Sequence, residues 1–101
     1  MIKSRSNTNR LICLLFTAEW CGSCQSLDPV WARIQQEFEG KMLFTKIDID
    51  KTPPSVSRFA ISSVPTLILY KNGEELWRKA GLLTTYELRA AVKRYLKPGK
   101  E

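Results

Sequence analysis

Apolar residues fall into short runs separated by polar segments, and their spacing changes along the chain. The near-continuous run Leu11–Thr17 is typical of a strand buried on both faces of a parallel sheet. Residues 42–49 form a second run, with Lys46 and Asp48 as polar insertions, which we interpret as another buried strand. A third run, Leu67–Tyr70, follows a proline and predicts a further strand.

Between the first two strands the spacing is helical. Apolar residues recur there at steps of three and four, which predicts one buried stripe on a helix that runs to about Glu39: Leu27, Val30, Trp31, Ile34 and Phe38. Pro29 should kink this helix, and Gly40 should end it. A short helix is expected from about Pro54 to Phe59, because proline is tolerated in a first helical turn.

The C-terminal third carries clear turn and cap signals. Asn72-Gly73 is a two-residue hairpin signal, of the turn type with two positive φ angles. Residues 74–79 should then form an antiparallel edge strand that Gly81 closes. Thr84 and Glu87 have the spacing of a capping box, which predicts the start of a last helix. The buried stripe of that helix is expected to comprise Leu88, Ala91, Val92, Tyr95 and Leu96.

The predicted order is β-α-β-α-β-β-α, which places the chain in the α/β class. Alternating strands and helices predict a parallel pair, and the hairpin adds an antiparallel edge. A length of 101 residues suits a single domain spanning 1–101. The polar segment 1–9 and the segment 97–101, where Pro98-Gly99 should stop the last helix, are expected to be poorly ordered ends.

Composition narrows the class of protein. With 44% hydrophobic and 26% charged residues, the chain is expected to be globular. The net charge of +6 is interpreted as a solvated surface with basic ends, because no long basic run and no aromatic–basic interleaving point to nucleic acid. No stretch approaches a membrane span, and the apolar run near the start lacks a cleavage site, so no signal peptide is predicted. Three cysteines suit a reducing compartment, and we expect a cytoplasmic location.

Two cysteines, Cys21 and Cys24, carry the candidate chemistry. If a helix begins near Gly22, its unpaired N–H groups and positive dipole end face the sulfur of Cys21 and favour the reactive thiolate. Cys24 lies almost one turn later, so the two sulfurs can meet and cycle between dithiol and disulfide. Zinc ligation and an inert structural disulfide are the alternatives. Zinc usually takes four N or S ligands, and the chain has three cysteines and no histidine, so a redox role is favoured. Cys13, inside the first strand, is interpreted as a small buried hydrophobe without redox function.

Several separated segments resemble the thioredoxin family, over roughly residues 10 to 96. They are, in order, Phe16-Thr17-Ala18-Glu19-Trp20-Cys21-Gly22-x-Cys24, Pro29, Lys46-x-Asp48-x-Asp50, Val64-Pro65-Thr66, Lys71-Asn72-Gly73-Glu74 and Gly81. The resemblance implies a thioredoxin fold: a central mixed four-stranded sheet flanked by helices. Only ten residues precede the first strand, so the fold is expected to be shortened at its N-terminus.

The resemblance also implies roles for individual residues. Cys21 is similar to the attacking thiol, Cys24 to the resolving thiol and Pro65 to the cis-proline that faces the active site. The implied rim of the substrate groove comprises Trp20, Gly22, Ser23, Val64, Pro65 and Gly81, with packing as the simpler interpretation of Trp20. The implied activity is reduction of protein disulfides. It involves no bound cofactor and no metal, and an NADPH-fed flavin thioredoxin reductase is the donor. We expect a monomer that binds neither nucleic acid nor membrane.

Two residues depart from the family's pattern inside the site. Ser23 stands where thioredoxins usually carry proline, which predicts a changed reduction potential; family values span about −270 to −120 mV, and we expect one near the reducing end. Leu15 stands where the family has a buried acid that helps to move the proton of the resolving thiol, so slower resolution is predicted. Lys46 resembles the family lysine close to the site of that buried acid, and its positive charge is expected to favour the thiolate form.

Other functions remain as alternatives. A non-catalytic binding module would use the same groove, although it has no need of both cysteines. A more oxidising disulfide oxidase or isomerase would use the same pair in the other direction. The remaining alternative is an iron–sulfur cluster shared by two chains, which would ligate it through Cys21 together with outside thiols.

Overall fold

The first and third apolar runs of the sequence lie side by side as the central strands of a four-stranded sheet. A computed structural model describes residues 10–96, and its sheet has the strand order β2-β1-β3-β4. β1 pairs in parallel with β2 and antiparallel with β3, which pairs antiparallel with β4. The elements are β1 (Ile12–Thr17), α1 (Gly22–Ser26), α2 (Asp28–Glu37), β2 (Leu43–Asp48), α3 (Pro53–Arg58), β3 (Thr66–Lys71), β4 (Glu74–Ala80) and α4 (Thr85–Tyr95). The mixed four-stranded α/β sheet expected from the sequence is confirmed. The two end segments, with Pro98-Gly99, lie outside the described residues.

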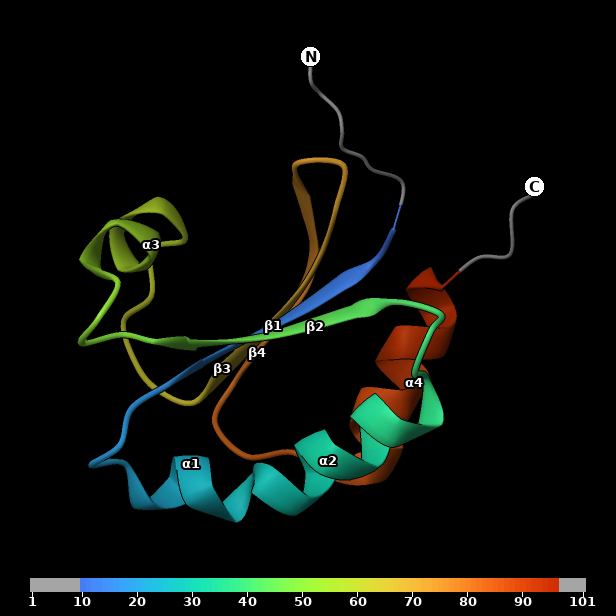
Figure 1. Ribbon diagram of the computed structural model, residues 1–101, viewed down its shortest axis with the longest axis horizontal. Coiled ribbons are helices and arrows are strands. Elements are labelled where there is room, and N and C mark those ends of the chain that lie inside the picture. Colours follow the sequence, from blue (N-terminus) through green and yellow to red (C-terminus); the bar gives the residue numbers. More distant parts are fainter. Residues whose placement is uncertain (1–9, 97–101) are drawn as a thin grey trace.

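Helices cover both faces of the sheet (Figure 1). α2 and α4 lie side by side on one face, where Cys13 and Leu15 of β1 point into the larger apolar cluster. α3 lies toward the other face, where Leu14 and Phe16 join a smaller cluster with Ile68. Because successive residues of a strand point to opposite faces, a run that is apolar at every position is what a doubly covered strand requires. The prediction for β1 is confirmed.

β2 is not the buried strand that its sequence predicts. It lies at the edge of the sheet, all six of its positions are partly or fully exposed, and Leu43 is 39% exposed. An edge strand is paired on one side only, so its apolar residues lack the second strand that would shield them. Lys46 and Asp48, taken as interruptions of a buried run, are part of an open surface.

The predicted long helix is divided in two. α1 ends at Ser26, Leu27 serves as the cap between the helices, and α2 begins at Asp28 with Pro29 in its first turn. Proline donates no backbone hydrogen bond, and a first turn is where that loss costs least. Leu27 keeps right-handed helical angles and its carbonyl accepts from Trp31 at 3.0 Å, so the direction of the chain is nearly preserved. Gly40 follows in a left-handed conformation, with φ of +82°.

The turn and cap signals are confirmed. Asn72 and Gly73 have φ of 55° and 80°, the two positive angles that the hairpin turn requires. In the capping box, the side chain of Thr84 accepts from the N–H of Glu87, and the carboxylate of Glu87 accepts from the N–H of Thr84 at 2.8 Å. Within residues 10–96, no helix combines the length and apolar character needed to cross a bilayer.

Candidate active site

Cys21 and Cys24 form a disulfide at the turn between β1 and α1. Cys21 is the N-cap of α1, with extended backbone angles, and Cys24 lies in the helix itself. Their Cα atoms are 5.2 Å apart, within the usual range for a disulfide. The structure therefore brings together the two sulfurs that the sequence singled out, at the start of a helix as expected.

Polar groups surround the sulfur of Cys21. Its Sγ accepts a hydrogen bond from the backbone N–H of Cys24 at 3.1 Å and lies 3.4 Å from the hydroxyl oxygen of Ser23. The carbonyl oxygen of Val64 is 3.8 Å away. An N–H and a hydroxyl directed at a sulfur stabilise negative charge on it. Ser23 thus places a hydroxyl beside the sulfur, at the position where the family usually carries proline.

Cys24 is the more buried member of the pair. It is 2% exposed and Cys21 is 6% exposed; both pack against Ala18, with Ile49 and Val64 alongside. The third cysteine, Cys13, is free and 0% exposed. Burial raises the pKa of the Cys13 thiol to about 12, so it stays protonated at neutral pH. The expected burial of Cys13 is confirmed.

A loop carrying Val64 and Pro65 lies against the disulfide. The Val64–Pro65 peptide bond is cis, as the resemblance implied. On one side of the loop, the hydroxyl of Thr66 donates to the carbonyl of Ser63 at 2.8 Å. On the other side, the N–H of Gly81 donates to the carbonyl of Pro65 at 2.8 Å. Gly81 has φ of +88°, a conformation that favours glycine. It directly follows β4, so its backbone hydrogen bond links that strand to the loop.

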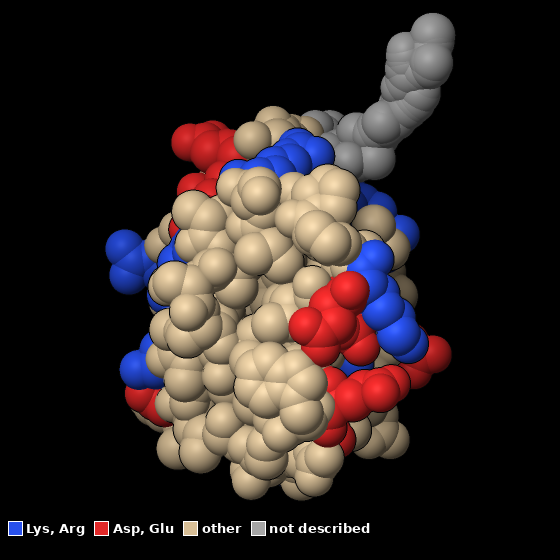
Figure 2. Space-filling model, turned by 90° about the vertical axis from the view of Figure 1, so that its left-hand side faces the viewer, with Lys and Arg blue, Asp and Glu red and all other residues tan. Residues whose placement is uncertain are grey.

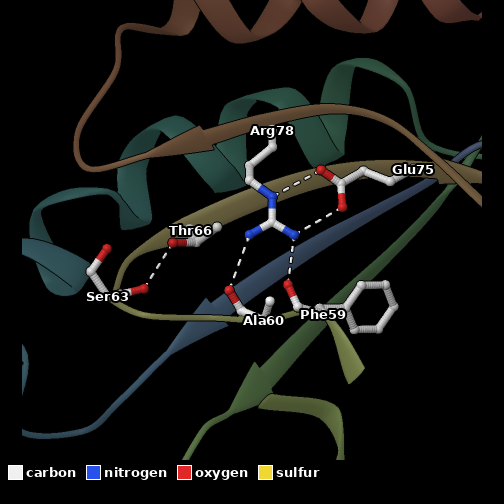
Figure 3. A network of polar contacts seen from close by, with 6 residues as sticks. All are labelled: Phe59, Ala60, Ser63, Thr66, Glu75 and Arg78. Carbon is white, nitrogen blue, oxygen red and sulfur yellow. Dashed lines mark hydrogen bonds and ion pairs between the residues drawn. The ribbon is translucent and has the colours of Figure 1, made fainter. Parts of the chain in front are cut away.

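An arginine of β4 holds the segment that leads into this loop (Figure 3). Arg78 donates twice to the carboxylate of Glu75, at 2.8 Å each. The same guanidinium donates to the carbonyl of Phe59 at 2.6 Å and of Ala60 at 3.5 Å. Its hydrogen bond holds the pKa of Glu75 below the ordinary value. We call this set of contacts the Arg78 clasp.

Sequence reasoning missed the Arg78 clasp for a geometric reason. In a regular strand, residues three apart point to opposite faces. A register shift between Leu69 and Tyr70 leaves Leu76 without a partner, so Glu75 pairs with Tyr70 and Arg78 with Ile68. Tyr70 and Ile68 share one face of β3, and therefore Glu75 and Arg78 share one face of β4. Nothing in the local sequence marks this bulge.

Lys46 lies behind the pair, on β2. Its Nζ is 3.3 Å from Oδ1 of Asp28, the first residue of α2. Lys46, Asp28 and Cys24 line one hollow of about 180 Å³, together with Thr17, Ala18, Glu19, Gln25 and Asp48. The parallel register sets Leu15 directly beside Lys46, and Leu15 is 1% exposed in the apolar core. Asp28 is a member of this group that sequence reasoning missed, since its link to Lys46 crosses from helix to sheet.

The remaining predicted rim residues lie around the turn. Trp20 is 68% exposed, and its indole N–H donates to Oδ2 of Asp50 at 2.8 Å. Gly22 is the first residue of α1, and a Cβ added there would meet nothing within 4 Å. Figure 2 shows this end of the molecule: uncharged residues fill its middle, and acidic side chains gather on one side next to a basic one. Within residues 10–96, no three His, Cys, Asp or Glu residues are grouped so that they would hold a metal ion.

Comparison with known proteins gives one consistent result. The family model for thioredoxin matches residues 3–94. A thioredoxin of Buchnera aphidicola is 40% identical over 82 residues, which cover 81% of this chain and 75% of that protein. A thioredoxin of Rickettsia conorii is 45% identical over 67 residues, covering 66% and 64%. A solved structure of thioredoxin-2, described as a component of the malaria parasite protein secretion machinery, is similar with a TM-score of 0.83 and 30% identity, covering 90% of this chain and 88% of that one.

Proposed function

The chain belongs to the thioredoxin family, and from that membership we propose that Cys21 attacks substrate disulfides and Cys24 resolves the intermediate. The family fixes the reaction: the protein is a thiol–disulfide oxidoreductase that reduces protein disulfides. The assignment of the two steps rests on one observation, the placement of Cys21 at the helix N-cap with hydrogen-bond donors directed at its sulfur.

In the first step the thiolate of Cys21 attacks one sulfur of a substrate disulfide. A mixed disulfide forms, and the other substrate sulfur leaves as a thiolate. The N–H of Cys24, 3.1 Å from Sγ of Cys21, and the hydroxyl of Ser23, 3.4 Å away, stabilise the attacking thiolate. In the second step the thiolate of Cys24 attacks Cys21 and releases the reduced substrate. The product is the Cys21–Cys24 disulfide, which is the state of the described structure.

The substrate is proposed to lie along the loop of Val64 and Pro65. The Val64 carbonyl, 3.8 Å from Sγ of Cys21, offers an acceptor to the backbone of an extended segment placed over the disulfide. Trp20, Gly22, Ser23 and Gly81 complete the rim of this groove. Trp20 is 68% exposed and so presents a large apolar surface to an incoming chain.

We extend the proposal to the wider setting of the protein, with family membership as its support. The oxidised pair is reduced again by a thioredoxin reductase, and the chain itself carries no resident cofactor. Residues 1–101 act as one domain, as a cytoplasmic monomer. The potential lies near the reducing end of the family's range of about −270 to −120 mV. A redox titration against glutathione measures that potential, and a value close to the oxidising end would favour the alternative of an oxidase or isomerase.

Reduction of insulin disulfides with dithiothreitol as donor tests the reaction. The wild type is expected to accelerate insulin precipitation, and Cys21→Ser is expected to abolish that acceleration. Cys24→Ser should accumulate a mixed disulfide through Cys21, visible by mass spectrometry under non-reducing conditions. Cys13→Ser is the matched control, because Cys13 is buried away from the pair, and its specific activity should equal that of the wild type. Full activity of Cys21→Ser would exclude the proposed attacking role, whereas a wild type that does not accelerate insulin precipitation would favour a binding module.

Alkylation tests the same assignment without a substrate. In the reduced protein at neutral pH, iodoacetamide should modify Cys21 at least tenfold faster than an unperturbed cysteine, because the thiolate is the reacting form. Labelling no faster than that of an exposed cysteine in a model peptide would remove the basis of the proposal.

A further inference from the structure

The resolving step needs a place for a proton. Cys24 is 2% exposed and packs against Ala18, Ile49 and Val64. Burial disfavours the charged form of a thiol, yet Cys24 must become a thiolate to attack. A nearby group therefore has to accept its proton, and β1, the strand that precedes the pair, contains no carboxylate.

One hollow connects Cys24 with charged groups. Its volume of about 180 Å³ exceeds by several times the roughly 30 Å³ that one water molecule takes in liquid. Its charged lining residues are Glu19 from the turn, Asp28 from α2, and Lys46 and Asp48 from β2. The hollow is thus large and polar enough to hold water between Cys24 and a carboxylate.

The contacts distinguish the three carboxylates of this hollow. Glu19 is 83% exposed at its side chain and pairs with Lys51 at 3.8 Å, toward solvent. Asp48 accepts from the backbone N–H of Asp50 at 2.9 Å and so caps its own turn. The side chain of Asp28 is also exposed, at 56%, but Asp28 alone of the three is paired with a cation that lines the hollow, with Lys46 Nζ at 3.3 Å.

Asp28 is also placed by the helix on the side of Cys24. It follows Cys24 by four residues, the spacing that puts two side chains on one face. The cap residue Leu27 keeps helical angles and donates to the carbonyl of Cys24 at 3.1 Å, so the break between α1 and α2 preserves that relation. In the sheet, the neighbour of Lys46 on β1 is the apolar Leu15. The helix therefore supplies a carboxylate on the side of Cys24, where β1 has none.

We propose that Asp28 accepts the proton of the Cys24 thiol through water in this hollow, with Lys46 holding the carboxylate in position. The inference rests on the proposed function of Cys21 and Cys24. In the step, the proton of Cys24 passes to water and a proton of that water passes to Asp28. The sulfur of Cys24 forms a bond to Cys21, and the bond between Cys21 and the substrate breaks. The substrate sulfur takes the electron pair and leaves as a thiolate, which is protonated by solvent.

A two-phase thiol assay separates this step from the first one. Dithiobis(nitrobenzoate) releases one coloured nitrothiobenzoate when Cys21 attacks it, and a second when Cys24 resolves the mixed disulfide. Reduced wild type and Asp28→Asn are compared by stopped flow between about pH 6 and 8. We expect the first phase to be unchanged within twofold and the second to slow at least tenfold in Asp28→Asn, since a positioned base contributes about 10²–10⁴-fold. The slowed phase should then rise about tenfold per pH unit, because hydroxide replaces the carboxylate.

Two control variants test whether the effect belongs to Asp28. Asp28→Glu keeps a carboxylate and should restore most of the second phase. Glu19→Gln removes another carboxylate of the same hollow and should match the wild type. Urea unfolding of each variant shows that all are folded under assay conditions.

The possible outcomes distinguish failure of this inference from failure of the proposed function. An unchanged second phase in Asp28→Asn overturns the inference, as does equal slowing in Glu19→Gln or failure of Asp28→Glu to restore the rate. Equal slowing of both phases also overturns it, because that result indicates a general effect on the pair. A wild type that shows no first phase contradicts the attacking role of Cys21 itself, which is the failure of the proposed function.

Discussion

Replacing Arg78 by methionine is expected to lower the free energy of unfolding by about 1.5 kcal/mol. Methionine keeps the unbranched stem and removes the guanidinium with all four contacts of the Arg78 clasp. The side chains of Arg78 and Glu75 are 33% and 37% exposed, so we discount their ion pair to about 0.5 kcal/mol. The two hydrogen bonds to the carbonyls of Phe59 and Ala60 contribute about 0.5 kcal/mol each at the low end of the usual range.

Urea unfolding followed by tryptophan fluorescence measures this loss. With a slope of about 1–2 kcal/mol per M for a domain of this size, the midpoint should fall by roughly 1 M and the slope should stay constant. A midpoint within about 0.2 M of the wild type, converted with the same slope, would refute the reasoning. It would show that water replaces the guanidinium at no cost.

A second variant divides the Arg78 clasp into its parts. Glu75→Gln removes the charge pair and leaves Arg78 free to donate to the loop carbonyls, so it should cost about 0.5 kcal/mol. Because the hydrogen bond from Arg78 lowers the pKa of Glu75 below 4.5 in the folded state, the stabilisation is complete above that value. It is lost as pH falls through the folded-state pKa of Glu75, and the wild type and Glu75→Gln should then unfold at the same urea concentration. Equal losses in Glu75→Gln and Arg78→Met at neutral pH would show that the loop contacts contribute nothing.

Three further predictions concern other sites. Ala60 has φ of 53°, a conformation that costs an alanine about 1–2 kcal/mol, so Ala60→Gly should raise the urea midpoint; a lower midpoint would contradict this. The raised pKa of Cys13, about 12 against an ordinary 9.0, leaves roughly a thousandfold less thiolate. Iodoacetamide at mildly alkaline pH should therefore spare Cys13 in the folded oxidised protein and modify it in urea, as read by mass spectrometry. Thr84→Ala removes the N-cap acceptor for Glu87 and should lower the melting temperature by about 4–8 °C, equivalent to about 1 kcal/mol, whereas an unchanged melting temperature would show that the cap is dispensable.

The sequence predicts the elements of this fold more reliably than their positions in the sheet. Local signals identified the hairpin at Asn72-Gly73 and the cap at Thr84, because turn geometry and capping depend on a few adjacent residues. The run at 42–49 resembles the run at 11–17, yet one forms an edge strand and the other a central strand. Strand order is decided by pairing between distant segments, which a local pattern does not contain.

In the candidate site, too, local patterns were predicted and contacts between distant segments were missed. The spacing of Cys21 and Cys24 identified the pair, and the resemblance identified the loop of Val64 and Pro65, which the structure places beside the sulfurs. Asp28 was missed because its partner, Lys46, is eighteen residues away on another element. Arg78 was missed because a bulge changes which side chains of β4 share a face.

The two sulfurs of the pair have different neighbours, and this separation has a consequence for the reaction. Cys21 lies among an N–H, a hydroxyl and a carbonyl at the surface turn, whereas Cys24 lines a hollow with Asp28 and Lys46. Under the proposed assignment, substitution at Ser23 should act on the stability of the attacking thiolate, because the Ser23 hydroxyl lies beside Sγ of Cys21. Substitution around the hollow should act on the proton of the resolving thiol. The two departures of this chain from its family, at Ser23 and Leu15, would then affect different steps, and we expect the rate of attack and the lifetime of the mixed disulfide to change independently of one another.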